Sequence, residues 1–160
     1  MTARTTLLDD GMRTALQAVG AAAKKGLGEP ALAELVQVRA SQLNHCAFCP
    51  DMHLALARRY GVSTPVPAGT EPRAWERQLE LLAAREEAGD VFGERERAAS
   101  ALTEAITVLT DGFVPDEVYE QAAKHFDGTR LAHPIGLITV INSWNRLMVA
   151  RRVPAGSTRW

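Results

Sequence analysis

The chain has 160 residues and a formal net charge of −1, with 46% hydrophobic and 23% charged residues. This length is enough for one domain with its own hydrophobic core. Basic and acidic residues are interspersed, so the basic stripe of a nucleic-acid-binding protein is missing. The sequence also lacks a run of ~18 apolar residues for a membrane helix, and its N-terminus does not resemble a signal peptide. We therefore predict a cytoplasmic protein with one domain at residues 1–153 and a C-terminal tail at 154–160.

Apolar residues recur with helical spacing from the start of the chain. A first helix is expected to end at the glycines of KKGLG. Its apolar face contains Met12, Leu16, Val19 and Ala23. Pro30 suits the first turn of a second helix that runs to about Asn44.

Helical patterns continue after a proline-rich loop, VSTPVPAGTEP. Further helices are expected to begin near Trp75, Glu94, Pro115 and Ile135. The last of them is apolar on almost all sides, and its Asn142 and Asn145 are expected to hydrogen-bond to other helices. Alternation typical of a strand is missing. The predicted fold class is all-α, a compact helical domain of about six to seven helices.

Both cysteines lie in one short stretch, NHCAFCPDMH, at residues 44–53. A disulfide between cysteines spaced Cys-x-x-Cys closes a loop too short to stabilise the fold much. In a cytosolic protein, such a pair is more typical of redox chemistry or metal binding.

The third helix is predicted to begin at this pair. Pro50 fits the first helical position, which makes Cys49 the N-cap residue, and Gly61 would close the helix. A sulfur at the N-cap faces the positive end of the helix dipole, so its thiolate is favoured. His53 follows one turn later on the same face and can exchange a proton with that sulfur. Cys46 is close enough to form a disulfide with Cys49.

This arrangement suits the reduction of a peroxide. A thiolate on Cys49 would attack the O–O bond, and His53 would supply the proton for the departing oxygen, directly or through water. The sulfenic acid on Cys49 would then condense with Cys46.

Zinc binding is an alternative that the residues leave open. A structural zinc needs four ligands, so His53 and one further histidine would have to complete the cysteine pair. The other histidines are His45, His125 and His133. The spacing C-x2-C-x3-H is more compact than that of zinc fingers, so we do not expect a zinc site. The thiol chemistry described above needs neither a metal nor a bound organic cofactor.

Glu34, Cys46, Cys49 and His53 together have the spacing E-x11-C-x2-C-x3-H. This pattern resembles the AhpD-like alkylhydroperoxidase branch of the carboxymuconolactone decarboxylase family. The core of the resemblance is VQVRASQLNHCAFCPDMHLALARRYGV, and it extends through ERERAASALTEAIT and VPDEVYEQAAKHF to INSWNRLMVARR in the last helix. The decarboxylase branch lacks the cysteine pair, so this pair favours the peroxidase branch.

The resemblance implies an all-helical fold, assembly into homo-oligomers (trimers or hexamers) and peroxidase activity against small-molecule hydroperoxides. It implies that Cys49 attacks, that Cys46 resolves, and that Glu34 and His53 belong to a proton relay. A dithiol or a lipoyl-bearing protein would re-reduce the disulfide. The chain departs from the best-known peroxidases at Phe48, where they carry histidine. That departure removes one relay member and favours organic hydroperoxides.

Two other functions would use the same residues. A redox sensor or interaction module would form the disulfide without catalytic turnover. A decarboxylase- or isomerase-type enzyme would use His53 and Glu34 as acid and base and would not need the cysteines.

Overall fold

The computed structural model describes residues 2–4, 8–63 and 74–158, and gives only the backbone for residues 60–63. The elements in chain order are α1 (Asp10–Leu27), α2 (Pro30–Leu43), α3 (Phe48–Ser63), α4 (Ala74–Leu81), the 3-10 helix η1 (Leu82–Glu87), α5 (Glu94–Thr107), α6 (Asp116–His125), the 3-10 helix η2 (Gly128–Leu131) and α7 (Ala132–Arg151). No strand occurs among the described residues, so the predicted all-α fold is confirmed. Most of the predicted proline-rich loop lies outside the described residues.

The first two helices begin and end as their sequence signals predict. Helix α1 ends before Gly28, which adopts a left-handed φ of 71° and donates its N–H to the carbonyl of Lys24. Pro30 is the first residue of α2. Helix α3 differs, because it continues through Gly61 to Ser63. The predicted C-cap at Gly61 is therefore wrong. A helix can continue through a glycine because glycine costs only about 1 kcal/mol relative to alanine at an interior position.

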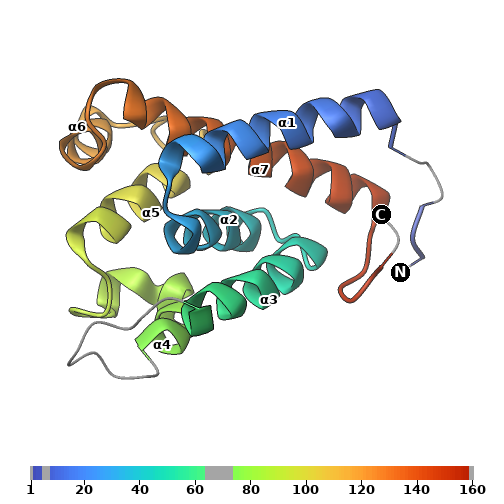
Figure 1. Cartoon of the computed structure of the whole chain (residues 1–160), viewed down its shortest axis with the longest axis horizontal. Helices are drawn as coiled ribbons and strands as arrows, with labels where there is room; N and C mark the ends of the chain where they lie inside the picture. Colours follow the sequence, from blue (N-terminus) through green and yellow to red (C-terminus); the bar gives the residue numbers. More distant parts are fainter. Residues whose placement is uncertain (1, 5–7, 64–73, 159–160) are drawn as a thin grey trace.

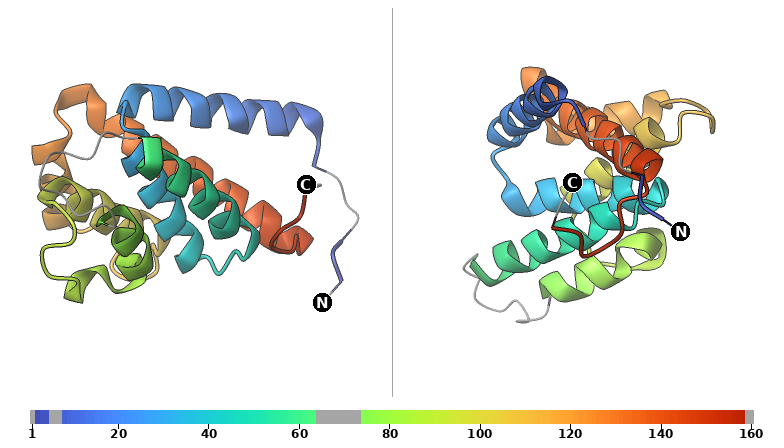
Figure 2. Two further views of the ribbon diagram at one scale, coloured as in Figure 1. Left: turned by 60° about the horizontal axis from the view of Figure 1, so that its bottom comes forward. Right: turned by 90° about the vertical axis from the view of Figure 1, so that its right-hand side faces the viewer.

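Helix α2 is the central element of the domain. It contacts α1, α3, α5, α7 and η1, and in Figure 1 it is seen nearly end-on between α7 and α3. Nine of its 14 residues are buried, so polar side chains on this helix are removed from solvent together with the apolar ones. Helix α1 packs against α7, on the opposite side of α2 from α3 (Figures 1 and 2). None of the described helices has both the length and the apolarity needed to cross a membrane.

The two asparagines of α7 link helices, as predicted. Asn142 accepts a hydrogen bond from the side chain of Asn44 at 2.7 Å and donates one to Thr107 at 3.0 Å. Asn145 is fully buried and accepts from the hydroxyl of Ser41 at 2.9 Å. Because polar groups buried without partners are costly, these bonds restrict how α7 can lie against α2 and α5.

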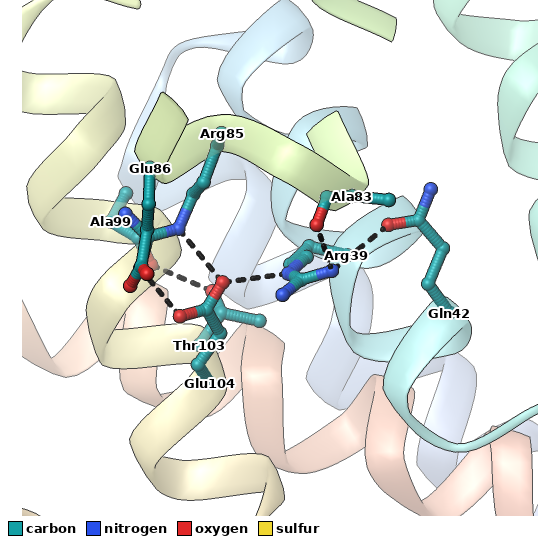
Figure 3. Close-up of polar contacts among 8 residues, drawn as sticks. All are labelled: Arg39, Gln42, Ala83, Arg85, Glu86, Ala99, Thr103 and Glu104. Atoms are coloured by element: carbon teal, nitrogen blue, oxygen red, sulfur yellow. Dashed lines mark hydrogen bonds and ion pairs between the residues drawn. The ribbon is translucent and has the colours of Figure 1, made fainter. Parts of the chain in front are cut away.

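A carboxylate on α5 holds two cations from other elements (Figure 3). Glu104 accepts from Nε of Arg39 on α2 and from Nε of Arg85 on η1, each at 2.7 Å. Burial raises the pKa of Glu104, but the hydrogen bonds and charges of the two guanidinium groups outweigh burial and hold it below the ordinary value of 4.5. Glu104 thus stabilises the fold at neutral pH. This contribution is present above about pH 4.5 and is lost as the pH falls through the lowered pKa.

We expect Glu104→Gln to lower the free energy of unfolding at pH 7 by about 1–3 kcal/mol, because two partly buried guanidinium groups lose their charged acceptor. Urea denaturation at pH 7 and at pH 3.5 measures this effect, and the difference from wild type should shrink at the lower pH. Glu86→Gln is the matched control, because Glu86 contacts the same Arg85 at 3.5 Å from a side chain that is 79% exposed. Equal losses in both variants, or a Glu104→Gln loss independent of pH, would contradict the bridge.

Candidate redox site

The turn between α2 and α3 determines where Cys46 lies. The N–H of Cys46 donates to the carbonyl of Ser41 and the N–H of His45 to the carbonyl of Gln42, each at 3.1 Å. This is the bond pattern of a Schellman C-cap. His45 occupies the left-handed position with φ of 52°, a conformation that costs a residue other than glycine about 1–2 kcal/mol. The motif ends α2 and leads the chain directly into α3, with Cys46 beside the start of that helix.

Cys46 and Cys49 form a disulfide, with their Cα atoms 5.5 Å apart. Cys49 is the second residue of α3, so the prediction that it is the N-cap residue is wrong. The sulfur that accepts an N–H at this helix end belongs to Cys46, which receives the bond from the backbone of Cys49 at 3.2 Å. The prediction failed because no residue of the first helical turn uses its backbone N–H in an intrahelical hydrogen bond, so proline is tolerated anywhere in that turn. Pro50 therefore marks the first turn of α3 but not the residue at which the helix begins. Both sulfurs still lie at the positive end of α3.

Glu34 is the centre of a charge cluster formed by three helices. From α2, its Oε2 lies 2.7 Å from Nδ1 of His53 on α3, and its Oε1 accepts from Nζ of Lys24 on α1 at 2.9 Å. Glu34 is 1% exposed and His53 is 5% exposed. Burial raises the pKa of Glu34, but the hydrogen bonds and charges of His53 and Lys24 outweigh burial and bring it below its ordinary value of 4.5.

The ionised Glu34 determines which nitrogen of His53 can take part in chemistry. A carboxylate can only accept hydrogen bonds, so Nδ1 of His53 carries the proton in this contact. The other ring nitrogen, Nε2, is thereby left for exchange with groups outside the cluster.

Cys49 and His53 line the same cavity, which has a volume of about 120 Å³. No hydrogen bond joins His53 to either sulfur within the described residues, so the shared cavity is what brings the two groups together. Cys46 is not part of the cavity wall. Apolar side chains predominate in that wall, which is formed by Gln17, Gln37, Phe48, Cys49, Met52, His53, Ile141, Trp144 and Met148. We call this space the Cys49 cavity.

The structure therefore brings the four predicted residues together. Cys46 and Cys49 are bonded, His53 shares a cavity with Cys49, and Glu34 reaches His53 across the contact between α2 and α3. The histidines at 45, 125 and 133 do not line this cavity. Among the described residues, no three side chains of histidine, cysteine, aspartate or glutamate form a group that could hold a metal ion.

Sequence reasoning did not single out Lys24 and Gln37. Gln37 lies in the wall of the Cys49 cavity. The sequence does contain a signal for it, because Gln37 follows Glu34 by three residues and so lies on the same face of the helix. Glu34, Gln37 and Ser41 are polar residues at helical spacing along one face of α2, and all three are buried. Lys24 offers no such signal, because its role depends on how α1 packs against α2.

The sequence profile of the carboxymuconolactone decarboxylase family matches residues 10–105. This chain belongs to that family. An uncharacterised family relative, YdfG of Bacillus subtilis (strain 168), is 37% identical over 117 residues, which cover 73% of this chain and 71% of YdfG. Among solved structures, a protein of unknown function from Agrobacterium tumefaciens, proposed to be the antioxidant defence protein AhpD, superimposes with a TM-score of 0.78. It is 27% identical, and the match covers 93% of both chains. This likeness and the cysteine pair place the chain in the AhpD-like branch of the carboxymuconolactone decarboxylase family.

For this family member we expect Lys24→Gln to make the fold more sensitive to acid. Ionised Glu34 stabilises the fold above its unfolded pKa, and this contribution disappears as the pH falls through the lowered folded pKa. Without Lys24 the folded pKa rises, so stability is lost at a higher pH. The free energy of unfolding measured between pH 3 and pH 7 tests this expectation.

The matched control is Lys25→Gln, which removes the neighbouring exposed cation of α1 and leaves Glu34 untouched. The profile of Lys25→Gln should follow that of wild type. If the two variants gave the same profile, the Lys24–Glu34 contact would not contribute to the pKa of Glu34.

Proposed function

We propose that the protein is a thiol-dependent alkyl hydroperoxidase in which Cys49 attacks the peroxide and Cys46 resolves. The observation that carries this proposal is the cavity shared by Cys49 and His53, with the ionised Glu34 directly behind His53. A nucleophilic sulfur, a proton donor and a second thiol are the groups that peroxide reduction requires.

In the first step, the thiol of reduced Cys49 gives its proton to Nε2 of His53, and the resulting thiolate attacks the terminal oxygen of ROOH. The O–O bond breaks, and the departing RO⁻ takes that proton from Nε2, directly or through water, and leaves as ROH. Glu34 keeps the Nδ1–H of His53 in place during this transfer. In the second step, the thiol of Cys46 attacks the sulfenic sulfur of Cys49, and water leaves as the disulfide forms.

The walls of the Cys49 cavity support organic hydroperoxides as the substrate class. Phe48, Met52 and Trp144 present apolar surface next to the sulfur, and the amide of Gln37 adds one polar group. Apolar surface favours the alkyl or aryl part of an organic hydroperoxide over hydrogen peroxide, which has no apolar part to bury.

The proposal includes a dithiol or a lipoyl-bearing protein as reductant and a cytoplasmic homo-oligomer, a trimer or a hexamer, as the working form. Two residues of the predicted apolar face of α1 support an oligomer, because Met12 is 53% and Val19 is 51% exposed in the single chain. Burial of such side chains against another copy would be favourable.

A second candidate is an acid–base enzyme of the decarboxylase or isomerase type. The contact between His53 and Glu34 favours it, because this pair does not depend on either cysteine. The two candidates differ in what they require, since acid–base activity would survive replacement of both cysteines by serine.

Purified protein is expected to consume cumene hydroperoxide when dihydrolipoamide is supplied. Cys49→Ser should abolish turnover because the nucleophile is lost. Cys46→Ser should stop after a single turnover and leave a sulfenic acid on Cys49 that dimedone traps, as mass spectrometry will show. Similar, substantial turnover in both variants would rule out the assigned roles.

His53→Gln should slow the oxidation of Cys49 by about 10²–10⁴-fold, the usual size of a general-acid contribution. The rate is read from single-turnover mixing of the reduced protein with cumene hydroperoxide. His125→Gln is the control, because His125 lies at the end of α6 and does not line the Cys49 cavity. Comparable rates in the two variants would exclude His53 from the proton transfer.

Met52→Ala tests the substrate class. We expect the ratio of kcat/KM for cumene hydroperoxide to that for hydrogen peroxide to fall by about three- to tenfold, since only the organic substrate loses apolar contact. Leu56→Ala, one turn further along α3 and outside the Cys49 cavity, should leave this ratio unchanged. A ratio unaffected by Met52→Ala would contradict binding of the organic group in this cavity.

A further inference from the structure

The two cysteines of the disulfide line two different cavities. Cys49 lines the cavity of about 120 Å³ that it shares with His53. Cys46 lines a second cavity of about 270 Å³, formed between the turn after α2 and the end of α7. Met148 is 2% exposed and belongs to both walls, so its side chain lies between the two spaces. We call the second space the Cys46 cavity.

A histidine and an arginine in strained backbone positions line the Cys46 cavity. Within the described residues, three residues other than glycine have a positive φ, and two of them, His45 at 52° and Arg152 at 56°, are in this wall. Each follows the C-terminal end of a helix, α2 or α7, where glycine would be the residue of lowest cost. Neither side chain forms a hydrogen bond or ion pair with another described residue. Strained residues of this kind concentrate at functional sites.

The rest of the cavity wall is apolar. Ala47, Met148, Val149, Val153 and Pro154 complete it, and no acidic side chain is included. A cavity with apolar walls and an arginine suits a thiolate carried on a hydrocarbon chain, because the guanidinium group favours the thiolate over the thiol and the walls contact the chain.

We propose that the Cys46 cavity is the entry site of the dithiol reductant and that the reductant attacks the sulfur of Cys46. This inference rests on the proposed function, in which a dithiol re-reduces the disulfide. The Cys46 cavity is the larger of the two and leaves space for a dithiol chain beside Cys46.

The exchange has two balanced steps. A thiolate of the reductant attacks Sγ of Cys46, the bond between Cys46 and Cys49 breaks, and its electron pair leaves on Cys49 as a thiolate at the positive end of α3. The second thiol of the reductant, as its thiolate, then attacks its own sulfur in the mixed disulfide and expels the thiolate of Cys46. That sulfur accepts the backbone N–H of Cys49, which stabilises the departing charge. The reductant ends as a disulfide and both cysteines are reduced.

The test maps which sulfur the reductant attacks. Oxidised wild-type protein is mixed with 2-mercaptoethanol as a monothiol probe, and N-ethylmaleimide then blocks the released thiolate. Tandem mass spectrometry distinguishes the two cysteines because Ala47 and Phe48 separate them. We expect the probe mainly on Cys46 and the maleimide mainly on Cys49. The reverse pattern, or equal amounts of both products, would overturn the proposal.

A variant tests the charge of Arg152. Arg152→Gly retains a backbone that suits a positive φ, and it should lower the ratio of the disulfide-reduction rate with dihydrolipoamide to the oxidation rate with cumene hydroperoxide by about two- to fivefold at low salt. Phe113→Gly is the matched control, because Phe113 is the third positive-φ residue, at 59°, and lies outside this cavity. An unchanged ratio in Arg152→Gly would overturn the role of this charge.

The mapping experiment needs no peroxide. A protein that fails to consume hydroperoxide but shows the expected mapping would refute the proposed function and support the assignment of the reductant to Cys46. A protein that turns over but shows the reverse mapping would refute this inference alone.

Discussion

The rest of the site depends on one buried carboxylate. Glu34 is almost inaccessible to solvent, and its two oxygens contact Lys24 and His53, which come from different helices. An unpaired charge at that position would cost several kcal/mol, so α1 and α3 must present their cation and imidazole to α2 whenever the chain is folded. The charge cluster thus contributes more to the geometry of three helices than to their net stability, because the desolvation of Glu34 offsets much of the gain from its contacts.

Helix α2 positions both parts of the candidate site. Its buried polar face holds Glu34 against His53 and holds Ser41 against Asn145 of α7, so the helix is fixed in rotation as well as in position. Its C-terminal end then becomes the Schellman turn that places Cys46 next to the first turn of α3. A change in the tilt of α2 would therefore move Glu34 and Cys46 together. One helix thus sets the position of the acid–base pair and of the disulfide.

Periodicity and spacing predicted much of this arrangement, and the failures have physical causes. The apolar stripes predicted the helices, and helical spacing predicted that His53 follows Cys49 by one turn on the same face. The place of Glu34 beside His53 was implied only by the family resemblance, because the two residues lie on different helices. The start of α3 was misplaced because the whole first turn tolerates a proline, so Pro50 carries no information about the single residue that caps the helix. Lys24 was missed because its partner lies on another helix, and sequence spacing does not report how two helices pack.

The site consists of two parts that different elements supply. His53 and Glu34 lie on helices and form an acid–base pair whose geometry needs neither sulfur. The cysteines lie at the turn between those helices and at the first turn of α3, where the dipole of that helix favours a charged sulfur. In this chain the two parts meet in the Cys49 cavity, so the turn adds two sulfurs to a helical framework that already holds the contact between His53 and Glu34.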